Sequence, residues 1–316
     1  EGELSLSLPG IRATLLPLPE IGSKFDITLY VETVGDSLRL TAVYNKSLFT
    51  AVRIQNMLAQ YQHLLAQIVA NPSRSLWDYS LVTPENAAVL PNPQEALSAE
   101  WHGSVVAQFA RQAGQLPEKE VVVDMYGRVT YQQLLNRVNQ LAHQLVTDGL
   151  QAEEVVAIYG HRSASLLWAV LGILRAGAAF VILDPTYPPE RLRRYLEVAQ
   201  IKGWIQLEAA GELPAPLHRY LAGLPLRSQL TLPTTLSGET SPVAHQPFTE
   251  PQISVTPDAL AYLAFTSGTT GQPKAIMGTK QPLSHFIYWY KKRFNLLADD
   301  HFSMLSGLAH DPLLRD

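Results

Sequence analysis

A polar, glycine-bearing segment between Thr266 and Lys274 contains the residue types that bind a polyphosphate. Glycine lets a backbone approach a bulky anion closely and turn its N–H groups towards it. Hydroxyl groups add hydrogen-bond donors, and a lysine adds a mobile positive charge. The segment therefore predicts a phosphate-binding loop, although such residues also form ordinary turns after strands. The candidate binding residues are Thr266, Ser267, Gly268, Thr269, Thr270, Gly271 and Lys274.

The spacing in this loop differs from that of the common nucleotide P-loop. That motif has two glycines separated by four residues, followed by Lys and Ser or Thr at the start of a helix. Here Gly268 and Gly271 are only three positions apart, and Pro273 precedes the lysine. The runs Leu260–Phe265 and Ala275–Met277 are mostly apolar and have strand length. We therefore expect the loop to connect two strands.

The string LAYLAFTSGTTGQPK, which ends at Lys274, resembles the phosphate-loop motif of the adenylate-forming enzymes. These are the adenylation domains of nonribosomal peptide synthetases, the acyl-CoA synthetases and the luciferases. The resemblance implies ATP and Mg²⁺ as cofactors, with the candidate residues of this loop at the phosphates and Lys274 as a catalytic residue. Phe265 stands where the family usually has tyrosine, and Ala275 stands where it usually has glycine.

A second candidate site is Asp311, which comes after a predicted strand at Phe302–Ser306. A carboxylate beyond the carboxyl end of a strand is well placed to bind an ammonium group, although Asp before Pro312 is also a common turn former. The sequence HDPL resembles the FDxS motif of amino-acid-activating members of the family. That resemblance implies that Asp311 binds the substrate's α-amino group. Residues 278–316 are most similar to the α-aminoadipate reductase type.

The elements that would position these residues alternate between strands and helices from Trp101 onward. Such alternation indicates an α/β fold with a mostly parallel sheet covered on both faces. Residues 208–257 show little periodicity apart from 226–232, so we expect a surface excursion there. The motifs VTYQQL and LRAGAAFVILDPTYPPER also resemble family motifs, in the family's order. The expected strands are 121–123, 155–159, 179–183 and 204–207, and the expected helices are 103–114, 129–148, 163–176, 188–200 and 281–295.

The first part of the chain, residues 1–82, has the pattern of a separate, small α/β unit. Residues 26–33 and 37–44 predict a hairpin, and residues 52–70 predict an amphipathic helix. This order resembles the C-terminal part of a condensation domain, but the family's HHxxxDG motif is absent from the sequence, so we expect a structural role. Residues 83–100 contain three prolines and predict a linker. Residues 101–316 then form the N-terminal part of an adenylation domain.

Composition limits the partners of the protein. A net charge of −4 argues against a nucleic-acid or anionic-membrane surface, and no apolar run reaches the ~20 residues of a membrane helix. The N-terminus lacks the basic region and apolar core of a signal peptide. The absence of cysteine excludes disulfides and thiolate metal sites and fits a cytoplasmic location. No protein metal ligands are assigned from the sequence.

The resemblance implies part of a multidomain nonribosomal peptide synthetase for secondary metabolite biosynthesis. Its substrate would be an amino acid, converted with ATP into aminoacyl-AMP and pyrophosphate, then transferred to phosphopantetheine. The phosphopantetheine would belong to a carrier domain outside this chain, acting in cis with the remaining synthetase domains. The family's adenine-binding segment, ribose-binding aspartate and C-terminal lysine are not found here, so we expect little turnover by the isolated chain. Open alternatives are an α-aminoadipate reductase type, a stand-alone acyl-CoA ligase and a non-enzymatic scaffold fragment.

Overall fold

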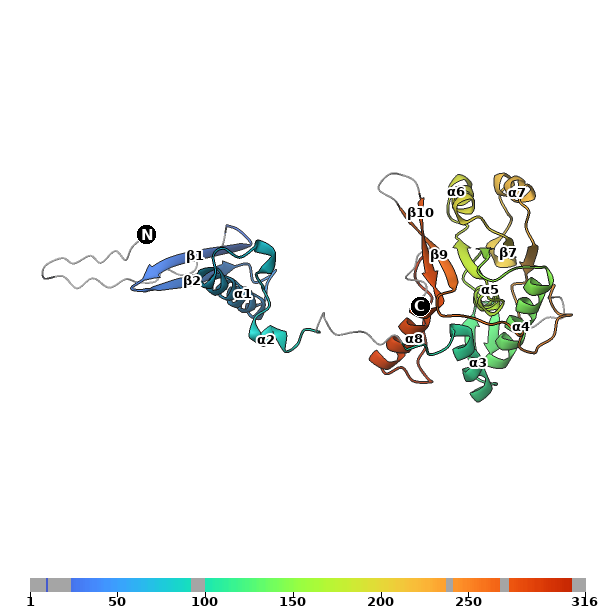
Figure 1. Cartoon of the computed structure of the whole chain (residues 1–316), viewed down its shortest axis with the longest axis horizontal. Coiled ribbons are helices and arrows are strands. Elements are labelled where there is room, and N and C mark those ends of the chain that lie inside the picture. The colour runs from blue at the N-terminus through green and yellow to red at the C-terminus, as the bar shows by residue number, and fades with distance from the viewer. Residues whose placement is uncertain (1–9, 11–23, 92–99, 237–240, 268–272, 309–316) are drawn as a thin grey trace. The chain divides into compact units, whose positions relative to one another are not determined.

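The computed structural model describes residues 10, 24–91, 100–236, 241–267 and 273–308. The chain divides into two compact units, Glu1–Leu97 and Ser98–Asp316, and both are drawn in Figure 1. Within the described ranges, no helix has the length and apolar composition needed to cross a bilayer.

The first unit consists of an antiparallel hairpin and a long helix, as the sequence predicted. Strands β1 (Ile27–Val34) and β2 (Ser37–Tyr44) pair around a turn in which Gly35 has φ +59°, a conformation that favours glycine. Helix α1 (Ala51–Ala70) begins after Thr50, whose side chain accepts a hydrogen bond from the Arg53 backbone N–H. A short helix, α2 (Pro84–Ala87), forms within the segment predicted as a linker.

The hairpin and α1 enclose little apolar volume. Ile54 on α1 is 4% exposed, and among the described residues of this unit it is the only large apolar side chain in the buried core. Val31 and Leu38 on the hairpin remain 53% and 63% exposed. Burial of apolar surface is the main driving force of folding, so this unit has a small hydrophobic contribution of its own.

The second unit is built on a six-stranded sheet with the order β10-β9-β6-β5-β7-β8. All neighbouring pairs are parallel except β9 and β10, which are antiparallel. This confirms the predicted mostly parallel sheet. The strands are β5 (Val155–Tyr159), β6 (Ala179–Leu183), β7 (Gly203–Leu207), β8 (Ser228–Leu232), β9 (Leu260–Ser267) and β10 (Pro273–Thr279).

Helices cover both faces of this sheet. Val156 and Ile158 of β5 pack into one core with α3 (Val105–Gln115), α4 (Tyr131–Thr147) and α5 (Ala164–Arg175). The alternate residues of β5 face a second core with α6 (Pro189–Ala199) and α7 (Ala215–Ala222), which lie side by side (Figure 1). Because successive strand residues point to opposite faces, a continuous apolar strand serves both cores. Helix α8 (Lys280–Arg293) comes directly after β10.

Three elements differ from the sequence expectations. Residues 129–130, predicted as part of a helix opening, belong to β4 (Gly127–Thr130), which pairs with β3 (Glu120–Asp124). The expected surface excursion instead contains α7 and the edge strand β8, and Leu217 and Leu232 there are fully buried. The predicted strand Phe302–Ser306 is wrong, because these residues have no regular secondary structure.

Candidate functional site

The predicted phosphate loop connects β9 and β10, as expected from the two apolar runs that flank it. The strands extend two residues further into the loop at each side than predicted, so Ser267 pairs with Pro273 and Thr266 with Lys274. Directly paired residues project their side chains from the same face of a hairpin, with Cβ atoms about 5 Å apart. Thr266 and Lys274 are both exposed. The structure therefore brings a hydroxyl and an ammonium group together at the base of the loop.

The remaining candidate residues lie in the loop itself and near the end of the chain. Ser267 ends β9, and its side chain is not described. The loop residues Gly268, Thr269, Thr270 and Gly271 lie outside the described residues, and so do His310 and Asp311. Their assignments to phosphates and to the substrate amino group stay predictions.

The loop begins at the edge of the sheet where ligands bind in open α/β folds. Because β9 is parallel to β6 and β6 to β5, their carboxyl ends lie at one edge. The chain leaves β5 towards β6 on one side and leaves β7 towards β8 on the other. Strands β5 and β7 thus form the topological switch point of the sheet, the usual ligand position in such folds. Only β6 separates β5 from β9, a span of two strand spacings or about 10 Å.

An aromatic pair fixes the base of the loop to helix α6. Phe265 is 7% exposed and stacks on Tyr195 with ring centroids 4.0 Å apart and ring planes 3° apart. The Tyr195 hydroxyl accepts a hydrogen bond of 2.8 Å from Arg191 Nε, and the Arg191 guanidinium lies 4.0 Å from the centroid of the Tyr187 ring. Sequence reasoning missed Tyr195. The spacing of Arg191 and Tyr195 on one helical face was the available signal.

A buried lysine fixes the far end of the same hairpin. Lys280, the first residue of α8, is 4% exposed, and its Nζ donates a 3.1 Å hydrogen bond to the Gly177 carbonyl oxygen. Burial lowers the pKa of Lys280, while the nearby Glu153 carboxylate opposes that shift. Phe265 on β9 anchors the loop end of the hairpin, and Lys280, directly after β10, anchors its other end.

Two further side chains, Tyr159 and Arg162, lie at or just beyond the carboxyl end of β5. Burial, and secondarily the charge of Asp184, raises the pKa of Tyr159 at the end of β5. Arg162, three residues further on, donates a 2.6 Å hydrogen bond from Nη2 to the Ser306 carbonyl oxygen. Sequence reasoning missed Arg162 as well. A basic residue three positions after the end of a fully buried strand was the signal that could have identified it.

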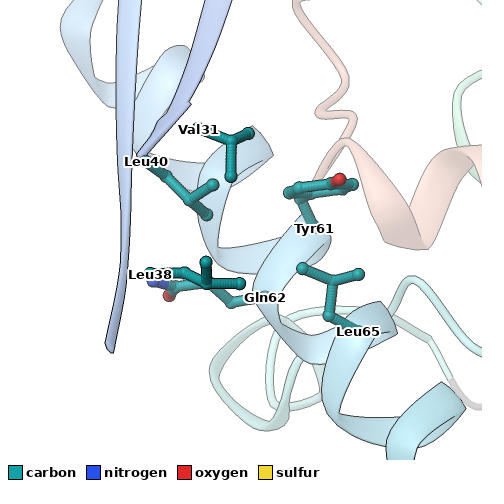
Figure 2. A pocket seen from close by; sticks show the side chains of 6 residues that line it. All are labelled: Val31, Leu38, Leu40, Tyr61, Gln62 and Leu65. Carbon is teal, nitrogen blue, oxygen red and sulfur yellow. The ribbon is translucent and has the colours of Figure 1, made fainter. Parts of the chain in front are cut away.

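The first unit has an apolar hollow between its hairpin and α1, shown in Figure 2, with a volume of about 270 Å³. Among the described residues that line it, Tyr61 has the only titratable side chain, and there is no carboxylate, histidine or lysine. The hollow therefore has a mostly apolar lining. Its lining residues are Val31, Leu38, Leu40, Tyr61, Gln62 and Leu65.

The fold and the loop define a class of protein. The family model of the AMP-binding enzymes matches residues 109–314, and the Condensation domain model matches residues 2–90. The chain belongs to the AMP-binding enzyme family, and its first unit carries a condensation-domain match. These matches confirm the resemblance seen in the loop motif and in the order of the first elements.

Curated relatives of the chain include two kinds of protein. The chain is 33% identical over 317 residues to the L-2-aminoadipate reductase large subunit of Penicillium chrysogenum, covering 92% of this chain and 22% of that protein. It is 31% identical over 298 residues to one of the linear gramicidin synthase subunits of Brevibacillus parabrevis, covering 92% of this chain and 4% of that protein. The chain thus spans about a fifth of the length of the reductase subunit and a much smaller part of the synthase subunit.

Solved structures of nonribosomal peptide synthetases share the fold. A four-domain synthetase bound to AMP and glycine has a TM-score of 0.62 and 21% identity, covering 95% of this chain and 21% of that chain. The AMPPNP-bound form of the synthetase FmoA3 has a TM-score of 0.59 and 22% identity, covering 92% of this chain and 30% of that chain. At these identities the likeness establishes the architecture alone.

Proposed function

We propose that the chain is part of a nonribosomal peptide synthetase type of protein that activates an amino acid with ATP. The observation that carries this proposal is the pairing of Thr266 with Lys274 at the base of the glycine loop, at the ligand-binding edge of an AMP-binding family sheet. Residues 1–82 would be the end of a condensation domain, 83–100 a linker, and 101–316 the N-terminal part of the adenylation domain.

The residues at the loop base fit a triphosphate. Thr266 offers a hydroxyl donor, and Lys274 offers an exposed ammonium group on a flexible stem. We assign the loop residues Ser267, Gly268, Thr269, Thr270 and Gly271 to the same phosphates. A Mg²⁺ ion bound with the nucleotide would neutralise further phosphate charge. Donors that are fixed before the reaction stabilise developing charge without reorganising, which lowers the barrier.

In the reaction we propose, an oxygen of the amino-acid carboxylate forms a bond to the α-phosphorus of ATP. The bond from that phosphorus to the bridging oxygen breaks, and pyrophosphate leaves with the electron pair. Lys274 would stabilise the charge that gathers on the phosphate oxygens, and Asp311 would hold the substrate's α-ammonium group. The aminoacyl group would then pass to the phosphopantetheine thiol of a carrier domain in cis, releasing AMP. Such a protein would act in the cytoplasm.

A second candidate is an α-aminoadipate-activating protein of the reductase type. It is favoured by the identity of 33% to an L-2-aminoadipate reductase large subunit across 92% of this chain. Both candidates share adenylation and transfer to a carrier, so they differ in the amino acid and in the fate of the acyl group after transfer. The substrate profile of adenylation separates them.

The test is amino-acid-dependent exchange of pyrophosphate into ATP by the full-length protein that contains this chain. The panel holds the standard amino acids, α-aminoadipate and matched acids without the α-amino group. We expect exchange with one amino acid. The exchange rate should fall about 10²–10³-fold in Lys274→Ala, as it does when a donor to the transition state is removed, and it should change little in the exposed control Lys291→Ala. A response to α-aminoadipate favours the reductase type.

Other outcomes contradict the proposal. Exchange only with acids that lack the amino group removes the role assigned to Asp311 and indicates an acyl-CoA ligase. If Asp311→Ala still catalyses exchange with an unchanged KM for the amino acid, Asp311 does not bind the substrate's amino group, and the rest of the proposal stands. No exchange with any acid, in a protein whose circular dichroism shows it to be folded, indicates a scaffold.

A further inference from the structure

Arg162 connects the carboxyl end of β5 to a segment that comes much later in the chain. Its Nη2 donates hydrogen bonds to the carbonyl oxygens of Ser306, at 2.6 Å, and Leu305, at 3.4 Å. The partners are 143 and 144 residues away in the sequence. The contact lies at the switch point of the sheet, where β5 ends beside β7.

The segment that Arg162 contacts lies in neither a strand nor a helix. Residues 302–306 are irregular, and the Leu305 side chain is 79% exposed. On either side, Met304 packs against the core that contains α5, and Leu308 is buried in the same core. The segment is thus packed against the core at Met304 and at Leu308. Arg162 fixes the direction of the backbone between them.

An arginine suits this position better than a lysine. Both hydrogen bonds come from Nη2, whose two N–H groups point in fixed directions because the guanidinium is planar, so this one nitrogen reaches two successive carbonyl oxygens. A lysine ammonium has the same charge, but its N–H groups rotate and have no fixed directions. Lysine at this position would therefore be expected to retain part of the attraction and lose the orientation.

We propose that Arg162 is a positioning residue for the amino-acid substrate. It holds residues 305–306, five positions before Asp311, at the edge of the sheet that also carries the phosphate loop. The inference rests on the proposed function, in which Asp311 binds the substrate's α-amino group. The loop is anchored separately by the stack of Phe265 on Tyr195. Arg162 therefore acts on amino-acid binding and leaves ATP binding largely unchanged.

The first test measures the backbone protection of this chain by hydrogen exchange. In Arg162→Ala, the amides of residues 303–308 should exchange about tenfold faster or more, as expected for the loss of a hydrogen bond from a charged donor. Arg162→Lys should have an intermediate effect. Arg193→Ala is the matched control, because Arg193 bonds only Glu190 and Glu197 of its own helix among the described residues. Unchanged protection of residues 303–308 in Arg162→Ala would overturn the inference.

The second test measures pyrophosphate exchange by the full-length protein. We expect Arg162→Ala to raise the KM for the amino acid by about tenfold and the KM for ATP by less than about twofold, with partial recovery in Arg162→Lys. An equal rise in both constants, or none in the amino-acid KM, refutes positioning while leaving adenylation intact. If the wild type itself exchanges with no amino acid, the proposed function fails, and the hydrogen-exchange result still decides whether Arg162 holds the segment.

Discussion

Helices α4 and α5 touch at Gly172, and adding one methyl group there tests how tightly the unit is packed. A Cβ atom on Gly172 would lie 2.5 Å from Cδ2, 2.8 Å from Cγ and 3.0 Å from Cβ of Leu141. Leu141 is fully buried, and its Cβ cannot rotate away. The two helices would have to move apart for Gly172→Ala to be accommodated.

Two effects of opposite sign determine how much Gly172→Ala changes the free energy of unfolding. Alanine in place of glycine in a helix interior is favourable by up to about 1 kcal/mol. Overfilling a packed core is unfavourable by about 1–3 kcal/mol, and the close approach to Leu141 Cβ and Cγ places this site in the upper half of that range. We expect Gly172→Ala to lower the free energy of unfolding by about 1–2 kcal/mol. For a domain of this size, each kcal/mol corresponds to a fall in Tm of roughly 2–4 °C.

The assay is urea unfolding monitored by circular dichroism and by tryptophan fluorescence, since Trp168 on α5 is fully buried. Gly114→Ala is the matched control, because Gly114 is also helical but has no atom within 4 Å of an added Cβ. It should leave stability unchanged or raise it. Adding Leu141→Ala to Gly172→Ala should cost less than the sum of the single changes, because the clashing atoms are removed. A Gly172→Ala protein as stable as the wild type would refute the reasoning.

Three further predictions concern single side chains. Phe265→Leu keeps apolar volume but loses the stack on Tyr195, so stability should fall by about 0.5–1.5 kcal/mol in urea unfolding; no change would mean that the stack does not stabilise the hairpin. Gln140→Ala removes two hydrogen bonds from its side-chain amide to the partly buried carbonyl oxygens of Ala244 and Gln246, for a loss of about 1–3 kcal/mol by the same measurement at about 0.5–1.5 kcal/mol per bond, and an unaffected midpoint would contradict it. Because burial raises the pKa of Tyr159, its neutral form stabilises the fold fully below the unfolded-state pKa of about 10, and that contribution disappears as pH rises through the higher folded-state pKa. Between pH 8 and 11, the free energy of unfolding should therefore fall more steeply with pH for the wild type than for Tyr159→Phe. An equal pH dependence of the two proteins would count against this.

The strands and helices near the loop could be predicted because their patterns are local. The buried strands read as continuous apolar runs, and the helices show apolar residues at helical spacing. The same reasoning failed for α7 and β8, because a short helix after proline and an alternating edge strand give weak signals. It also failed for residues 302–306. Their apolar composition suits a strand, but they have no regular secondary structure, and the carbonyls of Leu305 and Ser306 accept hydrogen bonds from the side chain of Arg162.

The candidate site was predictable in composition but not in geometry. The motif identified Thr266 and Lys274, but their direct pairing depends on the register of β9 and β10, which the loop sequence alone does not determine. Tyr195 and Arg162 could not be connected to their partners from the sequence. Each contact joins segments that are far apart in the chain, and only the packing of α6 and the order of the sheet bring them together.

The separate anchors of the loop and of residues 305–306 lead to a last prediction, on the double variant Arg162→Ala with Phe265→Leu. Arg162 comes after β5 and Phe265 lies on β9, so the anchors stand about 10 Å apart across β6, and the hydrogen-bond partners of Arg162 differ from the ring partner of Phe265. Changes at such distances usually add within about 0.5 kcal/mol. We therefore expect the two losses in unfolding free energy to add, and the amino-acid KM of the double variant in pyrophosphate exchange to match that of Arg162→Ala. A departure from additivity above about 0.5 kcal/mol, or a further rise of that KM, would show that β6 transmits changes between the two positions and that the anchors do not act independently.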